Sequence, residues 1–220
     1  MAILTDPIFQ TGQEQGSFPR KRLQQTVKHT LDFAGAAVML AVLSPLLLLI
    51  ALCIKLDDGG PVFYRRPVVG GRGEFDAYKF RTMRPDADAV LAADHSLRLR
   101  FEQDFKLRND PRVTQLGALL RKYSLDELPQ LLNVLKGEMS LVGPRMITAA
   151  ELQKYGPFGE LLLQVKPGLT GYWQVNGRQR VSYDERVKMD VYYLRHWNLR
   201  LDLEILLKTP IKVVRGEGAY

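Results

Sequence analysis

The chain has 220 residues, which is room for one domain, or one domain plus an appendage, with a buried core. Its 31 Lys and Arg against 24 Asp and Glu give a net charge of +7, which favours anionic partners: nucleic acid, acidic lipid or phosphorylated metabolites. A single cysteine, Cys53, excludes an intrachain disulfide, and its place in an apolar run predicts a buried thiol. Three histidines without a Cys/His cluster argue against zinc and favour an oxygen-ligated metal such as Mg²⁺.

The N-terminal part of the chain reads as a tail followed by a membrane segment. Residues 1–19 mix Gly, Gln, Pro and Thr without periodicity, which predicts a mobile tail. Arg20, Lys21, Arg22 and Lys28 then precede a nearly unbroken apolar run over residues 33–54. That run is long enough to enter a bilayer, and it is longer than the apolar part of a cleaved signal peptide.

Two features of this run complicate a simple crossing. Ser44-Pro45 interrupts it, and proline removes a helix hydrogen bond and clashes with the preceding turn, so a bend is expected. Basic residues also follow the run, at Lys55, Arg65 and Arg66, so the positive-inside rule favours both ends on the cytoplasmic side. A helix that enters, bends at Pro45 and returns to the same face satisfies both features. A transmembrane helix with a proline kink is the alternative.

A short β-hairpin is predicted after the apolar run. Residues 61–64 and 74–81 are its arms, separated by a glycine-rich turn over residues 70–73. Lys79 and Arg81 at its end place two cations on one face of a strand, where they either clamp a diphosphate or remain solvated edge charges.

The rest of the chain predicts helices and loops. Residues 86–107 form an amphipathic pattern that packs on the core or on lipid. Residues 143–178 are rich in Gly and Pro, which predicts mostly loops with one or two short helices. A capped helix is expected over residues 182–197, and residues 201–214 fit a helix in the headgroup plane. A further helical stripe consists of Val113, Leu116, Leu120 and Tyr123. The apolar face of the helix over residues 182–197 consists of Val187, Val191 and Leu194. Its aromatic residues, which suit either the core or the membrane interface, are Tyr192, Tyr193 and Trp197.

Two adjacent carboxylates, Asp126 and Glu127, occupy a predicted helix start. Ser124 as N-cap and Glu127 three residues later form a capping-box pattern. The positive end of a helix favours ionised side chains and attracts phosphate, so one carboxylate can face phosphorus while the other faces a cation. Arg121 lies close in sequence and suits a phosphoryl group, or pairs with Asp126. The predicted apolar stripe of this helix is Leu125, Leu128, Leu132 and Leu135.

A plain structural interpretation of the same pattern exists. Ser-x-x-Glu would then only cap the helix, and Asp126 would be a surface acid that complements the dipole. At the level of the whole chain, the corresponding alternative is a non-catalytic basic membrane adaptor that binds anionic lipid or a synthase partner. Nucleic-acid binding is disfavoured because the basic residues are spread along the chain and share it with a bilayer segment.

Several strings of sequence together resemble one family, the bacterial sugar transferases, also called monotopic polyprenyl-phosphate phosphoglycosyl transferases. The resemblance runs from about Lys21 to the C-terminus. The strings are Lys79-Phe80-Arg81-Thr82-Met83, Asn109-Asp110-Pro111-Arg112-Val113, Ser124 to Gln130, Gly137 to Arg145, Lys166-Pro167-Gly168-Leu169-Thr170-Gly171 and Gln174-Val175-Asn176-Gly177-Arg178.

The resemblance implies a transfer of sugar-1-phosphate from a UDP-sugar, with galactose or glucose, to undecaprenyl phosphate. It implies a ping-pong mechanism in which Asp126 is the nucleophile that forms a phosphosugar-aspartyl intermediate and Glu127 is the Mg²⁺ ligand. The substrate-binding residues implied by the family motifs are Lys79, Arg81, Arg121, Arg145, Gln174 and Arg178. One departure stands out, because the family's Gly-Pro-Arg-Pro reads Gly143-Pro144-Arg145-Met146 here. The second proline would stiffen that loop, and this chain lacks it.

The resemblance also implies an architecture. The expected fold is α+β and mostly helical, with a tail over 1–19, a re-entrant membrane helix over 20–57 that breaks at Ser44 and Pro45, and a membrane-associated catalytic domain over 58–220. The expected location is the cytoplasmic face of the bacterial inner membrane, where exopolysaccharide synthesis begins. The expected partners are the UDP-sugar, undecaprenyl phosphate and the bilayer, without nucleic acid, and a second copy of the chain is left open. The chain resembles the minimal catalytic form, without the extra transmembrane spans of longer relatives.

Overall fold

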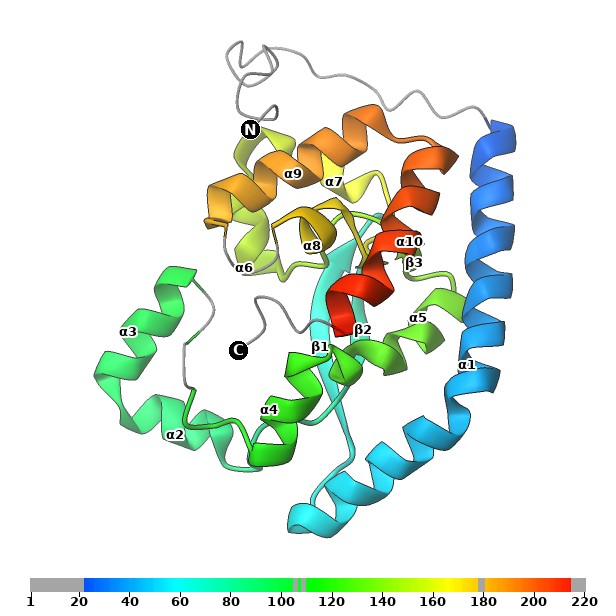
Figure 1. Ribbon diagram of the computed structural model, residues 1–220. Helices are drawn as coiled ribbons and strands as arrows, with labels where there is room; N and C mark the ends of the chain where they lie inside the picture. The colour runs from blue at the N-terminus through cyan, green and yellow to red at the C-terminus, as the bar shows by residue number, and fades with distance from the viewer. Residues whose placement is uncertain (1–21, 105–106, 108–109, 178–180, 215–220) are drawn as a thin grey trace.

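The fold is mostly helical α+β, with a long N-terminal apolar helix and two small sheets, as the sequence predicted (Figure 1). The computed structural model describes residues 22–104, 107, 110–177 and 181–214. The predicted tail and the predicted site residue Arg178 lie outside the described residues.

Helix α1, Arg22–Asp58, runs along one side of the rest of the molecule (Figure 1). It changes direction between its blue first part and its cyan last part, and Pro45 lies inside it. Proline has no N–H to donate to the carbonyl four residues earlier, which here is Ala41. The Ser44 hydroxyl donates to that carbonyl at 2.9 Å instead. The Ser-Pro pair therefore bends the helix without leaving the freed carbonyl bare.

Only a narrow stripe of α1 packs on the rest of the protein, and its buried apolar residues are Ala36, Ile50 and Ile54. Leu48 is 71% exposed and Leu52 55% exposed. Among the helices that the structure describes, α1 alone is long and apolar enough to cross a membrane. Cys53 is exposed, so the prediction of a buried thiol was wrong. Its neighbour Ile54 occupies the packed stripe, and adjacent helix residues point about 100° apart.

Two small sheets follow. Strands β1, Phe63–Gly70, and β2, Gly73–Phe80, form the predicted antiparallel hairpin. Strands β3, Ser140–Val142, and β4, Gly168–Thr170, form a parallel pair that the sequence analysis missed. Each has only three residues and β3 is buried throughout, so neither shows the alternation that marks a half-exposed strand.

The predicted helix over residues 86–107 is two helices, α2 (Ala87–Ala93) and α3 (His95–Asp104). Asp94 separates them in an extended conformation, and its Oδ1 accepts a hydrogen bond from the Leu97 amide at 2.9 Å. The side chain therefore caps α3 and ends α2, as short acidic residues often do. Helix α4, Gln115–Lys122, begins at Thr114, whose hydroxyl accepts from Gly117 N.

Residues 143–178 were predicted to be mostly loop, and that prediction was wrong. The part that the structure describes, residues 143–177, consists mostly of short helices. Thr148 and Glu151 form a capping box, while Tyr155, Leu162 and Trp173 are buried, so local caps and core contacts outweigh the Gly and Pro content. The elements here are α6 (Ala149–Leu152), the 3₁₀ helix η4 (Gln153–Phe158), α7 (Gly159–Leu163) and α8 (Tyr172–Asn176).

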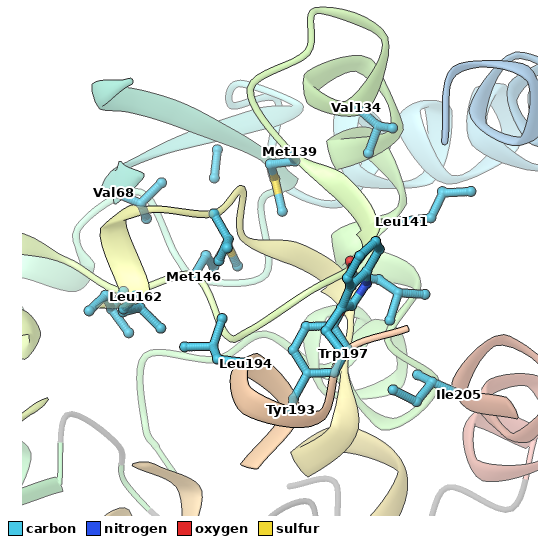
Figure 2. Packing of buried hydrophobic residues seen from close by; sticks show 14 of the residues in the cluster. Val68, Val134, Met139, Leu141, Met146, Leu162, Tyr193, Leu194, Trp197 and Ile205 are labelled. Atoms are coloured by element: carbon cyan, nitrogen blue, oxygen red, sulfur yellow. The ribbon is translucent and has the colours of Figure 1, made fainter. Parts of the chain in front are cut away.

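The last two helices match the sequence prediction. Helix α9, Tyr183–His196, starts with a Ser182–Glu185 capping box, and α10, Leu199–Val214, follows it. The core gathers side chains from β1, α5 (Leu131–Leu135), β3, α7, α9 and α10 (Figure 2). Tyr193 and Trp197 belong to this core, which decides between the two roles considered for them. Helix α10 keeps an apolar exposed face, which consists of Leu203, Leu206, Leu207, Ile211 and Val214.

A buried polar network, here called the anchor network, ties α1 to β3, α9 and α10. Lys28 donates to Asp202 Oδ2 at 2.7 Å and to the Val142 carbonyl at 2.9 Å. Tyr193 Oη and Trp197 Nε1 donate to the same Asp202 carboxylate, at 2.7 and 3.1 Å. Every polar group of this network has a partner, which is the condition for burying an ion pair without a large penalty.

Candidate active site

The carboxylate pair lies on η3, a 3₁₀ helix over Leu125–Gln130, and not on the predicted capped α-helix. Ser124 has φ 54° and its side chain makes no capping hydrogen bond. Pro129 cannot donate a backbone bond to Leu125, which favours a short 3₁₀ turn ahead of α5, Leu131–Leu135. Because a 3₁₀ turn has three residues, the apolar stripe shifts by one position. The predicted stripe was therefore wrong at Leu132, which is 42% exposed, whereas Leu131 and Val134 are buried.

Asp126 is a buried carboxylate within a group of charges. The residue is only 8% exposed. Burial raises the pKa of Asp126 to about 6, the positive charges of Lys79 and Arg121 act in the opposite direction, and the negative charge of Glu127 raises it further. The group is therefore mainly ionised at pH 7 but holds its charge at a cost, as a reactive carboxylate does.

Glu127 faces β2 and contacts Lys79. The Lys79 Nζ donates to Glu127 Oε1 at 2.6 Å, and the Glu127 side chain keeps 32% of its exposure. Burial alone would raise the pKa of Glu127, but the Lys79 ammonium outweighs it and the pKa is lowered, with Arg145 and Arg66 contributing. Glu127 thus stays ionised beside a partly exposed surface that an incoming cation can reach.

Arg121 sits in the last turn of α4, as the sequence order suggested. Its Nε donates to Thr82 Oγ1 at 2.9 Å. Among the ion pairs of the described residues, none joins Arg121 to Asp126, so the simple pairing that the sequence left open is not formed. Burial lowers the pKa of Arg121, and the charge of Asp126 opposes that shift, which places the two groups within electrostatic range. The guanidinium is available to a third group between them.

Arg145 approaches the site from the loop after β3. Its backbone N–H donates to Asp190 Oδ1 at 3.3 Å, and its guanidinium lies 4.9 Å from the centre of the Trp173 ring. Its buried Nε has no hydrogen-bond partner among the described residues, and the same holds for Trp173 Nε1 and the neighbouring Gln174 Oε1. Two of these atoms are donors and the Gln174 oxygen is an acceptor, and buried polar atoms without partners are groups that a ligand can satisfy.

Lys79 and Arg81 have different partners in the structure, although they were predicted to share a strand face. Strand β2 ends at Phe80, and Arg81 turns to Asp58 at the end of α1. Its Nη1 donates to Asp58 Oδ2 at 2.6 Å and its Nε to the Pro61 carbonyl at 2.6 Å. The structure therefore brings together Lys79, Asp126, Glu127, Arg121 and Arg145, while Arg81 holds the junction between α1 and the hairpin.

Comparison with known proteins identifies the family of the chain. A model of the family described as bacterial sugar transferase matches residues 23–216. The chain belongs to the bacterial sugar transferase family. This confirms the resemblance stated from the sequence motifs.

The relatives of this transferase carry related names. The undecaprenyl-phosphate galactose phosphotransferase of Salmonella typhimurium is 48% identical over 206 residues, covering 91% of this chain and 43% of that protein. The exopolysaccharide production protein ExoY of Rhizobium meliloti is 46% identical over 198 residues, covering 88% of each chain. The undecaprenyl-phosphate glucose phosphotransferase of Komagataeibacter xylinus is 38% identical over 209 residues, covering 88% of this chain and 37% of that protein. The chain thus spans less than half the length of several relatives it matches.

The residues of this site fit magnesium, the metal that the family resemblance implied. Among the described residues, no group of three or more His, Cys, Asp or Glu side chains could hold a metal by itself. Mg²⁺ is usually bound through one or two carboxylates together with substrate phosphates. Glu127, the predicted ligand, supplies one such carboxylate and its side chain is 32% exposed, so it suits a metal whose other ligands come from a nucleotide diphosphate.

Two residues that lie beside the site, Arg66 and Asp190, were not predicted from the sequence to belong there. Arg66 was assigned to the membrane flank, yet its Nη2 lies 3.0 Å from Glu151 Oε2 and its charge reaches Glu127. Alternation along β1 was a signal for this, because Arg66 and the buried Val68 are two residues apart and share a strand face. Asp190, whose pKa burial raises to about 7, gave no sequence signal of its role beside Arg145.

Proposed function

We propose that this protein transfers sugar-1-phosphate from a UDP-hexose, galactose or glucose, to undecaprenyl phosphate, through a covalent intermediate on Asp126. The observation that carries the proposal is a buried carboxylate with a pKa of about 6 that the charges of Lys79 and Arg121 reach, beside a Lys79–Glu127 pair on which Arg145 also acts. The names of the relatives support the choice of sugars and acceptor.

In the first step, an Asp126 Oδ attacks the β-phosphorus of the donor. A bond forms between that oxygen and phosphorus, and the bond from phosphorus to the bridging oxygen breaks, so UMP leaves with the electron pair. Arg121 and Arg145 bind the phosphates and oppose the charge that develops on the leaving group. Lys79 keeps Glu127 ionised, and Mg²⁺, when bound by Glu127, supplies charge neutralisation across the diphosphate.

In the second step, an oxygen of undecaprenyl phosphate attacks the phosphorus held on Asp126. The Asp126–phosphorus bond breaks, the carboxylate is regenerated, and a lipid-linked diphosphate sugar leaves. The covalent step lets one carboxylate serve a water-soluble donor and a lipid acceptor in turn. The intermediate on Asp126 must last until the second substrate arrives. The burial of Asp126 excludes water that would otherwise hydrolyse this intermediate.

The membrane arrangement follows from the need to reach a lipid phosphate. We infer that α1 is re-entrant, entering the cytoplasmic face of the bacterial inner membrane and returning at the Ser44-Pro45 bend. The exposed apolar side chains of α1 and of α10 support lipid contact on two elements of the fold. This arrangement would hold the carboxylate pair near the headgroup layer.

The deciding experiment measures UMP release from UDP-galactose or UDP-glucose with undecaprenyl phosphate. Wild type should turn over, and Asp126→Asn should lose at least a thousandfold in kcat because an amide cannot attack phosphorus. Glu127→Gln should lose activity and its dependence on Mg²⁺. Lipid-linked product at a near wild-type rate from Asp126→Asn would refute the nucleophile. A folded wild type that binds membranes without turning over any UDP-sugar would favour the adaptor interpretation.

A further inference from the structure

A second cationic feature lies between α1 and β3, apart from the carboxylate pair. A shallow hollow that opens to solvent is lined by Lys28 and His29 of α1, by Ser140 and Val142 of β3, and by Lys166. We call this space the basic crevice. Lys28, one of the charged residues that line the crevice, is buried, with an exposure of 6%.

Lys166 brings a charge to this crevice that the protein does not neutralise. Its Nζ lies 3.5 Å from His29 Nδ1, and no described carboxylate is within ion-pair distance of it. Partial burial lowers the pKa of Lys166, and the positive charges of Arg72 and Lys28 lower it further, with Asp32 acting in the opposite direction. Positively charged side chains that lie close together at a partly buried site repel one another, and this favours binding of an anion between them.

The carboxylates nearby are already committed to other groups. Asp202 accepts from Lys28, Tyr193 and Trp197 in the anchor network. Asp32 accepts from the Ser140 hydroxyl at 2.7 Å and from the Leu141 amide at 3.0 Å. Lys28 is shared between Asp202 at 2.7 Å and Asp32 at 3.8 Å. Lys166 and Arg72, which both lie beside Gly137, have no carboxylate of the described residues within ion-pair distance.

The height of the crevice identifies the anion. His29 precedes Phe33, where the apolar run of α1 begins, by four residues, which is about 6 Å along a helix axis. A group bound at His29 and Lys166 therefore lies where the apolar surface of α1 gives way to charged surface. In a bilayer that level is occupied by lipid headgroups, whose common anion is phosphate.

We propose that the basic crevice binds the phosphate group of a membrane lipid, at a site separate from Asp126. Gly143 and Pro144 also line the crevice, and Arg145, the next residue, contributes to the electrostatics of Glu127. The lipid phosphate and the reacting diphosphate thus lie on either side of one loop. This site does not depend on the transfer chemistry, because its residues are distinct from the carboxylate pair and its arginines.

The test measures lipid binding directly, on the full chain in a neutral detergent. The probes are dioctanoyl phosphatidylglycerol, undecaprenyl phosphate and inorganic phosphate, and the readout is the rise in melting temperature with probe concentration. Lys166→Gln should weaken binding of a lipid probe at least threefold, and Arg72→Gln with Lys166→Gln at least tenfold. Lys154→Gln, an exposed lysine outside the crevice, is the matched control and should bind as wild type does.

The outcomes separate the possible sources of the phosphate. A loss confined to phosphatidylglycerol assigns the site to a bilayer phospholipid. A loss confined to undecaprenyl phosphate, with a raised KM for that acceptor and an unchanged KM for the UDP-sugar, assigns it to the acceptor. Equal affinities in all variants would overturn the proposal, and so would inorganic phosphate binding as tightly as the lipids. Asp126→Asn should keep full lipid affinity, so a failure of the proposed transferase chemistry leaves this result readable.

Discussion

The Lys79 ammonium lies 2.6 Å from Glu127 Oε1, and its charge reaches both members of the carboxylate pair. It lowers the pKa of Glu127, and it opposes the rise that burial imposes on the pKa of Asp126. One lysine on β2 therefore keeps two adjacent carboxylates ionised in a place where burial alone would favour protonation of both.

The first prediction concerns the acid limb of the pH profile. In the proposed mechanism Asp126 attacks only when ionised, and its pKa of about 6 means that the ionised fraction falls tenfold for each pH unit well below that value. We expect kcat/KM for the UDP-sugar to be level near pH 7.5 and to fall below about pH 6. Steady-state UMP release in a constant-ionic-strength buffer checks this. An acid limb centred near pH 4 would mean that Asp126 is not desolvated during catalysis.

The second prediction removes the lysine. In Lys79→Met the charge that lowers the pKa of Asp126 is gone, so the acid limb should move to higher pH as well as the rate falling. Lys136→Met is the control, since Lys136 is exposed and its Nζ bonds Tyr78 Oη on the same hairpin at 2.5 Å. An acid limb that stays in place in Lys79→Met, with only the rate lowered, would contradict the electrostatic role.

The third prediction is that the nucleophile costs stability. The folded pKa of Asp126, about 6, lies above the usual 3.8. The contribution of Asp126 to stability is therefore lost as pH rises between these values, and the ionised form costs the fold about 3 kcal/mol at neutral pH. Asp126→Asn should unfold at a temperature several degrees higher than wild type at pH 7.5 while being inactive. Equal melting temperatures at pH 4 and a lower one for the variant at pH 7.5 would reverse the argument.

The fourth prediction tests the anchor network. Asp202→Ala leaves Lys28 buried without its main counterion, a change that typically costs about 3–5 kcal/mol. Glu204→Ala, two residues along α10, removes an exposed pair with Arg200 and should change stability by less than about 1 kcal/mol. Denaturant unfolding in detergent measures both. Similar small losses in the two variants would show that the network does not hold α1.

The fifth prediction concerns topology. In a Cys53→Ser background, needed because Cys53 is exposed, single cysteines at Ser17 and Gly59 should resist an impermeant thiol reagent in intact cells and react after lysis. Labelling of either position from outside would reject the re-entrant helix and favour a single crossing.

Sequence reasoning found the features that local chemistry determines. The Ser182–Glu185 cap, the glycine turn of the hairpin and the bend of α1 near Pro45 depend on residues close in the chain. The 3₁₀ form of η3 was missed because Ser-x-x-Glu is the same string in either helix type, and Pro129 carried the deciding information. The pairing of Lys79 with Glu127 could not be read from spacing, because it depends on how β2 packs against η3.

The residues that seat the N-terminal helix arrive very late during synthesis. Lys28 and Asp202 are separated by 174 positions, so α1 leaves the ribosome long before this closer counterion exists. Only Asp32, four residues along α1 and 3.8 Å from the Lys28 ammonium, is made together with it. Until α10 is made, the Lys28 ammonium must stay in water or among headgroups, which keeps the start of the helix at the surface while the apolar part sinks. The Lys28 ammonium can be buried in the protein only after α10 has been made. The depth of α1 is therefore fixed at the end of translation.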